Sequence, residues 1–312
     1  MSVVNNIFLI LVQGVWIVGL SPLLAGVINK TKARLQGRRG PRLLQPYYDL
    51  IKYLNKEAVF SSHRSWLTLA VPYIVFTTTV VSGLLLPVIG NGFGINGDIL
   101  VFVYLFALTR FITALAAIDT GSAFGGMGAS REMALNTVIE PAFILAVLAI
   151  ILQTGTTNFS QVLAILTQNG LYVSLPYVLA LVAMLLVILG ETGRIPVDNL
   201  DTHLELTMIH EGMVLEYSGR YLGLMAFSSK IKQFLFICLF VLFFFPFAQP
   251  EITGFTSGIL ALLIISIKIF LVGIFIAFIE MMYAKLRLYQ VPKLFMTSMT
   301  LSFLAIVVHL LF

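Results

Sequence analysis

The chain has 312 residues, of which 59% are hydrophobic and only 11% charged, and its mean hydropathy is +0.99. This composition excludes an ordinary water-soluble domain and predicts an integral membrane protein, with a single polytopic domain over residues 1–312. The net charge of +5 would suggest nucleic-acid binding in a soluble protein. Here the basic residues lie between apolar runs, where they orient a chain in the membrane.

Eight apolar runs have about the length that a bilayer-spanning helix requires. They do not alternate between polar and apolar residues, as the strands of a membrane barrel would, so helices are the remaining way to satisfy their backbone groups. The sequence therefore predicts an all-α membrane protein with about eight transmembrane helices, at residues 7–28, 66–89, 99–118, 133–153, 175–190, 233–248, 258–282 and 294–312.

Lysine and arginine are distributed unevenly between the connections. Nine of them lie between Lys30 and Arg64, whereas residues 90–97, 154–174 and 249–257 contain none. The positive-inside rule then predicts that the basic connections face the cytoplasm and that both termini lie outside. Within the first basic loop, residues 43–60 have apolar side chains at helical spacing, which predicts an amphipathic helix on the membrane surface. A wall over a cavity that is entered from the side is the alternative.

The most polar stretch is residues 191–219, which contains six of the fourteen acidic residues and lies between two apolar runs. Its residue types admit a metal site, because His203, Glu205, His210 and Glu211 are all common ligands. The pattern HExxH of zinc proteases is absent, which argues against that interpretation. The single cysteine, Cys238, lies in an apolar run, so this chain alone cannot form a disulfide, an iron–sulfur site or a zinc site.

Four charged residues lie inside predicted spans: Arg110, Glu140, Lys268 and Glu280. A charge at the bilayer centre costs about 2.5 to 3.5 kcal/mol on insertion scales, so such residues usually face a partner or water and are functional by default. The alternative is structural, with Arg110 and Lys268 neutralising Glu140 and its neighbours to hold the bundle together.

Several carboxylates are predicted to meet on one side of the membrane. Glu132 and Glu140 are eight residues apart on one helix, so both can line one polar seam. Asp119 ends the third predicted span and Glu191 ends the fifth. Together they predict the start of a buried chain of carboxylates.

The chain also contains, in order, the strings GRRGP (37–41), IDTGSAFGGMGASRE (118–132), EP (140–141), ETGRIPVD (191–198) and LEYSG (215–219). As an ordered set, these strings resemble the membrane-anchor subunit of energy-converting, group 4 nickel–iron hydrogenases and formate hydrogenlyase, the hydrogenase-4 component C type. That subunit is homologous to the ND1-like subunit that forms the quinone chamber of respiratory complex I. The chain departs from the complex I pattern at residues 197–211, which read VDNLDTHLELTMIHE instead of a dense run of glutamates.

The resemblance implies a non-catalytic subunit of an oxidoreductase in a prokaryotic cytoplasmic membrane. Such a subunit docks a soluble arm on its cytoplasmic face, abuts antiporter-like membrane subunits and contributes to proton translocation. Iron–sulfur clusters and the nickel–iron site are then expected in partner subunits, with no cofactor bound by this chain; quinone stays open as a ligand. Two other functions are kept, a quinone-chamber subunit of NADH:quinone oxidoreductase and a freestanding ion-coupled carrier, which would usually show internal repeats.

The candidate site residues combine the matched motifs with the charges found inside the spans. The predicted proton or charge relay consists of Asp119, Glu132, Glu140, Glu191, Asp198, Glu205, Glu211, Glu216, Lys268 and Glu280. The residues predicted to dock a subunit or face an anion are Arg38, Arg39, Arg131, Arg194 and Arg220. No catalytic residue and no metal ligand is expected in this chain.

Overall fold

The computed structural model describes residues 3–59, 65–88, 97–168, 174–198, 209–247 and 255–311. These ranges contain seven helices that are long and apolar enough to cross a membrane: α1 (Val3–Leu35), α3 (Trp66–Leu84), α4 (Ile99–Asp119), α5 (Ala123–Thr154), α8 (Gly219–Phe244), α9 (Phe255–Met282) and α10 (Val291–Leu311). An eighth apolar helix, α7 (Leu175–Glu191), has 17 residues and is about 26 Å long, close to the thickness of a hydrocarbon core. The predicted all-α membrane fold is confirmed.

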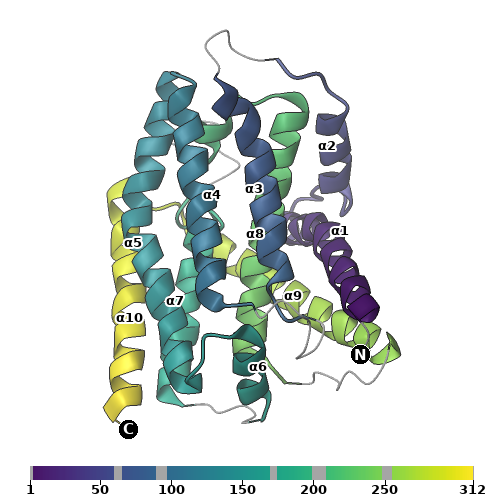
Figure 1. Cartoon of the computed structure of the whole chain (residues 1–312). Helices are drawn as coiled ribbons and strands as arrows, with labels where there is room; N and C mark the ends of the chain where they lie inside the picture. The colour runs from purple at the N-terminus through teal and green to yellow at the C-terminus, as the bar shows by residue number, and fades with distance from the viewer. Residues whose placement is uncertain are drawn as a thin grey trace.

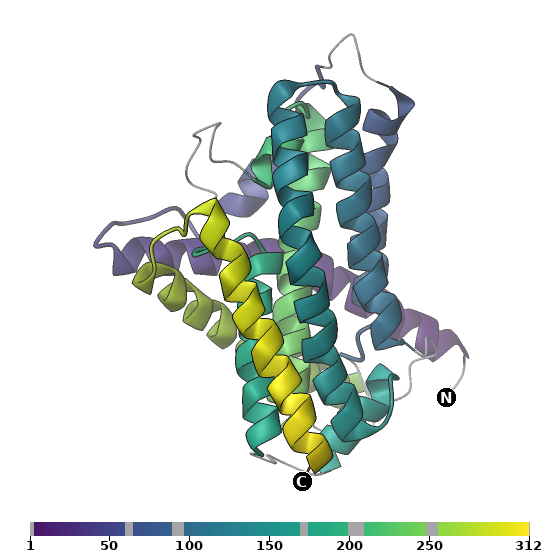
Figure 2. The same ribbon diagram turned by 90° about the vertical axis from the view of Figure 1, so that its left-hand side faces the viewer.

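The helices form an upright bundle crossed by an inclined pair. Helices α3, α4, α5, α7, α8 and α10 run side by side, while α1 and α9 pack together at an angle to them (Figures 1 and 2). Helix α8 is central, since it contacts α1, α3, α7 and α9, and every residue from 231 to 244 except Lys232 is buried. On the face shown in Figure 2, α5 lies between α4 and α10.

Aromatic side chains fix α4, α5 and α8 against one another. The ring of Phe236 on α8 lies 5.0 Å from that of Phe106, 5.2 Å from that of Phe143 and 6.2 Å from that of Phe102. Edge-on and tilted ring pairs of this kind contribute about 0.5–1.5 kcal/mol each beyond the burial of their area. The polar residues of α8 lie before this aromatic core, at the end of the bundle that carries the functional site.

The predicted amphipathic helix is present as α2 (Gln45–Leu54). It packs against α1 and α8, burying Pro46 and Leu50 and leaving Tyr48 and Ile51 exposed. Its Tyr53 lines a cavity of about 490 Å³. Helix α2 therefore forms part of a cavity wall. This agrees with the second of the two interpretations of residues 43–60.

Several helix ends differ from the predicted spans: α1 extends to Leu35, α3 ends at Leu84 and α5 begins at Ala123. The span predicted at 233–248 begins at Gly219, because the polar residues that precede it point into a cavity and do not end the helix. Residues 154–174, predicted as a plain outer loop, contain a short helix, α6 (Phe159–Gln168). The Asn158 side chain accepts hydrogen bonds from the amides of Ser160 (3.0 Å) and Gln161 (3.4 Å), which caps the start of α6.

Candidate functional site: a charged cavity and a row of ion pairs

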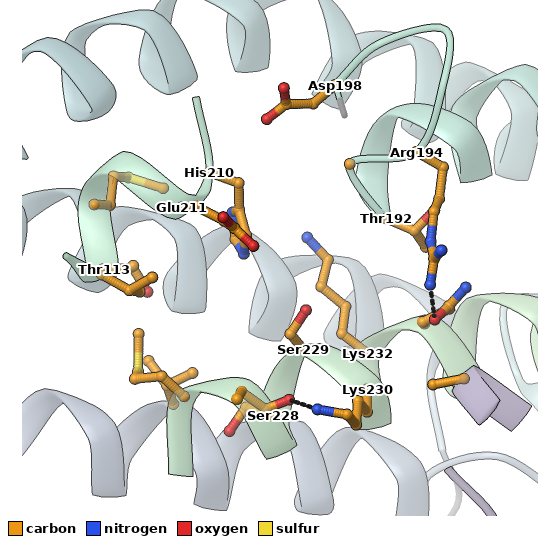
Figure 3. A pocket seen from close by; sticks show the side chains of 18 of the residues that line it. Thr113, Thr192, Arg194, Asp198, His210, Glu211, Ser228, Ser229, Lys230 and Lys232 are labelled. Atoms are coloured by element: carbon orange, nitrogen blue, oxygen red, sulfur yellow. Dashed lines mark hydrogen bonds between the residues drawn. The ribbon is translucent and has the colours of Figure 1, made fainter. Parts of the chain in front are cut away.

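A cavity of about 490 Å³ lies along one face of α8, between α1, α3, α4 and the segments that follow α7 and precede α8 (Figure 3). Its lining is apolar around Val75, Leu222 and Met225. The charged side chains that line it are Lys32, Arg110, Glu132, Arg194, Asp198, Glu211, Lys230, Lys232 and Glu280. Intramembrane charges are expected to face such a cavity, where water can reach them.

The end of α7 places two of these charges. Glu191 is the last residue of the helix, and Gly193 adopts the left-handed conformation (φ 58°), so the chain turns and the amide of Arg194 donates back to the Leu189 carbonyl (3.0 Å). A glycine in this conformation is the usual residue just after a helix C-terminus, because other side chains are strained there. The turn directs Glu191 toward α4 and α8 and Arg194 toward α9.

Glu191 lies between two cations. Its carboxylate is fully buried and forms ion pairs with Arg110 of α4 and with the ammonium of Lys232 of α8, the latter at 3.0 Å. A buried carboxylate is tolerated when cations and hydrogen bonds replace the lost hydration. Two opposing charges therefore hold Glu191 in its ionised form.

Arg110 extends the pairing to a second carboxylate. Its other terminal nitrogen lies 2.8 Å from the carboxylate of Glu140 on α5, whose side chain is 37% exposed. On α5, Thr137 and Ile144 on either side of Glu140 are exposed. Lys232, Glu191, Arg110 and Glu140, here called the charge row, therefore lead from the cavity to the outer surface of the bundle, with one residue from each of α8, α7, α4 and α5.

A second group of ion pairs surrounds Glu280. The carboxylate is fully buried, 2.7 Å from the ammonium of Lys32 on α1 and 3.4 Å from the guanidinium of Arg194. Arg194 also donates a hydrogen bond to Gln233 of α8 (2.8 Å). Lys32, Glu280 and Arg194, here called the Glu280 cluster, join α1 and α9 to the segment after α7.

Asp198 completes the wall of the cavity beside the connection after α9. It is buried and accepts a hydrogen bond from the ammonium of Lys285 (2.7 Å). The amide of Leu286 donates to the carbonyl of Pro196 (2.9 Å). The connection after α9 is thereby attached to the connection after α7.

A smaller cavity of about 20 Å³ lies beside Glu191 and is large enough for one water molecule. Its ionisable lining residues are Glu132, Glu191, Asp198, His210 and Lys232. The pKa of His210 is held below its usual range, because burial disfavours the imidazolium and outweighs the attraction of Glu132. His210 is therefore neutral near pH 7.

The approach of the segment before α8 to α5 depends on Gly128. A Cβ atom built on Gly128 would lie 3.1 Å from backbone atoms of Ile209, Gly212 and Met213. The small residues of the string GGMGAS thus let the chain carrying His210 pack directly on α5.

The structure brings several of the predicted relay residues together. Glu132, Asp198, Glu211 and Glu280 line the large cavity, and Glu191 and Glu140 lie in the charge row. Glu216 is partly exposed, on the connection before α8. Glu205 and His203 lie outside the described residues.

Asp119 and Lys268 lie elsewhere. Asp119 accepts hydrogen bonds from the hydroxyls of Ser65 (2.5 Å) and Thr68 (2.9 Å), and so joins the end of α4 to the start of α3. Lys268 donates to the carbonyls of Phe245 (3.0 Å) and Phe247, just beyond the C-terminus of α8. A cation at a helix C-terminus compensates the helix dipole, so these contacts stabilise the end of α8.

The predicted docking residues also divide into two kinds. Arg38, Arg39 and Arg220 are exposed, with Arg220 stacked on the ring of Tyr221. Arg194 is buried inside the Glu280 cluster, and Arg131 is partly buried near the start of α5.

Sequence reasoning misses three of the paired cations: Lys285, in the connection after α9, and two that lie in helices, Lys32 and Lys232. The charge distribution places both among the basic residues of cytoplasmic loops, whereas both lie inside helices. For Lys232, the sequence does carry a signal. Leu222, Met225 and Ala226 have helical spacing, which indicates that α8 begins before its lysines.

The fold and site define a class: a polytopic all-α membrane protein with a charged cavity joined to ion pairs between its spans. The family described as NADH dehydrogenase matches residues 7–310, so the chain belongs to this family. The resemblance seen in its motifs is thereby confirmed.

Individual relatives agree with this assignment. The chain is 35% identical over 300 residues to formate hydrogenlyase subunit 4 of Escherichia coli (strain K12), an alignment covering 95% of this chain and 96% of that protein. It is 31% identical over 297 residues to hydrogenase-4 component C of the same organism, covering 95% and 93%. The chain is therefore similar to membrane subunits of complex I-like assemblies.

A solved structure shares the fold. A chain in the membrane-bound sulfane sulfur reductase, an archaeal respiratory membrane complex, superposes with a TM-score of 0.83 at 19% identity, covering 98% of this chain and 99% of that one. The multi-pass membrane architecture is thus common to both.

Proposed function

We propose that this chain is the membrane-anchor and coupling subunit of an energy-converting, complex I-like hydrogenase in a prokaryotic cytoplasmic membrane. It docks a soluble arm that carries iron–sulfur clusters and a nickel–iron site, and it relays protons or charge to antiporter-like membrane subunits. The relatives named formate hydrogenlyase subunit 4 and hydrogenase-4 component C support this choice of complex. The observation that carries it is the charge row, which leads from the cavity to the outer face of α5.

The charge row is suited to pass a change in charge across the bundle. Arg110 is shared between Glu191 and Glu140, so a proton taken up by one carboxylate frees the guanidinium for the other. One unit of pKa corresponds to about 1.4 kcal/mol, and one altered charge combined with burial shifts a carboxyl by about two or three units. A redox event in the docked arm that changes the charge near the cavity is then sufficient to load or release a proton.

The docking face is assigned to the side that carries the basic loops. Arg38 and Arg39 lie between α1 and α2 and are exposed, as is Arg220 at the start of α8. Exposed guanidinium groups suit an acidic partner surface, because they bind carboxylates with two hydrogen bonds. With this side cytoplasmic, both termini lie outside, which labelling of a terminal cysteine in sealed vesicles tests.

Replacement of Glu140 by Gln tests the proposal. In the assembled complex, electron transfer by the soluble arm should continue while proton movement across the membrane falls, because the outer carboxylate of the charge row no longer changes charge. Glu57→Gln makes the same chemical change at an exposed position and serves as the control. Unchanged proton movement in Glu140→Gln, with assembly intact, contradicts the proposal.

A second function, the quinone-chamber subunit of an NADH:quinone oxidoreductase, is favoured by the large cavity. Its volume of about 490 Å³ lies in the usual range for small-molecule sites, and it combines an apolar end near Leu222 with polar side chains such as Gln233. This function predicts that a short-chain quinone analogue inhibits the intact complex, and that Leu222→Trp, which fills the apolar end, abolishes the inhibition. Activity that is insensitive to the analogue removes this candidate.

A further inference from the structure

Lys232 connects the two cavities. It lines both of them, and it supplies the only lysine or arginine in the described lining of the smaller one. Figure 3 shows its side chain extending from α8 into the space below Asp198, between His210 and Arg194. Its ammonium is paired with Glu191 at 3.0 Å. Lys232 is therefore a cation that faces the cavity acids and the charge row together.

The charge row is balanced only while Lys232 is part of it. It contains two carboxylates, Glu191 and Glu140, and two cations, Arg110 and Lys232. Without the lysine, one guanidinium must serve two carboxylates, one of them fully buried. A buried carboxylate that loses a cation takes up a proton, because desolvation then favours its neutral form.

Two other carboxylates lie within the small cavity that Lys232 lines. Asp198 already accepts a hydrogen bond from Lys285, and Glu132 approaches from α5. The lysine side chain has a flexible four-carbon stem and keeps its charge while it turns. Its ammonium can therefore leave Glu191 for the side of the cavity where Glu132 lies.

We propose that Lys232 is a positioning residue of the relay: its ammonium keeps Glu191 ionised, and Glu191 takes up a proton when the ammonium turns toward Glu132. The proton reaches Glu191 through the small cavity, which has room for one water molecule and is bounded by His210. Arg110 then pairs with Glu140 alone. The proposal rests on the proposed function, since it gives the charge row a control point.

Infrared spectroscopy of the purified intact complex at pH 7 tests this directly, because a protonated carboxyl group has its own C=O stretching band. Lys232→Met should add one such band relative to the wild type, and the band should disappear in the double variant with Glu191→Gln. Lys232→Arg, which keeps the charge, should restore the wild-type spectrum. Lys230→Met is the matched control, since Lys230 lines the large cavity but its ammonium donates to the carbonyl of Ala226 (3.4 Å).

The proposal is overturned if Lys232→Met shows no new band, if Lys230→Met shows the same band, or if Glu140→Gln and not Glu191→Gln removes it. Should the Met variant fail to assemble, Lys232→Gln removes the charge with a polar side chain and carries the same expectation. The band reports the charge of Glu191 and not proton transport. A normal coupling ratio in Glu140→Gln therefore contradicts the proposed function while leaving the role of Lys232 to be judged by its own spectrum.

Discussion

Glu191 and Glu280 are both fully buried, and each lies between two cations. They differ in what lies beyond the cations. The Glu191 pairing continues through Arg110 to Glu140, which is partly exposed on the face of α5. In the Glu280 cluster, Lys32 and Arg194 both contact the one carboxylate, which joins α1 and α9 to the segment after α7.

Glu191 and Glu280 therefore suit different roles: proton transport for Glu191 and the attachment of helices for Glu280. A carboxylate that shares a cation with a second carboxylate can take up a proton while that cation keeps a partner, as Arg110 keeps Glu140. Neutralising Glu280 would remove the buried carboxylate that joins Lys32 of α1 to Arg194, so we expect Glu280 to stay charged. We therefore propose that the relay uses the charge row and that the Glu280 cluster has a structural role.

The largest expected effect on stability follows from Glu280→Gln. The substitution removes the carboxylate that Lys32 and Arg194 share, and removal of one partner from a buried ion pair costs about 3–5 kcal/mol. Thermal unfolding of the detergent-solubilised complex measures this loss. Glu191→Gln should unfold at a higher temperature than Glu280→Gln, because Glu140 still neutralises Arg110; the reverse order would show that the two clusters have been assigned the wrong way round.

A smaller effect on stability depends on pH and arises from His210, which lies near Glu191. His210 lies beside the charge row, and its pKa is lowered by burial. The unfolded chain binds a proton at His210 once the pH falls below about 6.5, whereas the folded chain does not. Stability should therefore decrease as the pH falls below about 6.5, by at most about 1.4 kcal/mol per pH unit from this residue.

Thermal unfolding between pH 7 and pH 5.5 checks this dependence. His210→Asn should reduce the slope, since asparagine does not titrate in this range. An unchanged slope in His210→Asn would mean that other groups account for the acid sensitivity.

The smallest effect is expected at Asp119, which the sequence predicts to belong to the relay. Its carboxylate accepts hydrogen bonds from Ser65 and Thr68 at the start of α3, so Asp119→Asn should cost about 1 kcal/mol, as the loss of a helix-capping contact does. Proton coupling should remain at the wild-type level. A loss of coupling comparable with that of Glu140→Gln would place Asp119 in the relay after all.

Much of the fold follows from the order of apolar and charged residues along the chain. Apolar runs of about twenty residues identify the spans, and the intramembrane charges Arg110, Glu140 and Glu280 stand out because their burial is costly. The partners of these charges do not follow from the sequence. Arg110 and Glu191 are 81 residues apart, and the packing of both α4 and α7 on α5 brings them together.

Two lysines show why the rest was not predictable. Lys268 has the sequence signature of an intramembrane counter-ion, but it binds carbonyl groups at the end of α8. Lys232 has the signature of a loop cation, but it lies on α8 and pairs with Glu191. In both cases the environment depends on where a neighbouring helix begins or ends, which is the least determined feature of a hydropathy pattern.

The number of protons moved per electron pair, compared between Glu191→Gln and Glu280→Gln in sealed vesicles, tests the central claim most directly. Normalisation to the assembled complex removes the difference in stability. We predict that Glu191→Gln loses almost all proton movement while electron transfer continues, and that assembled Glu280→Gln keeps the wild-type ratio. A wild-type ratio in Glu191→Gln, or an equal loss in both variants, would contradict the assignment of the relay to the charge row.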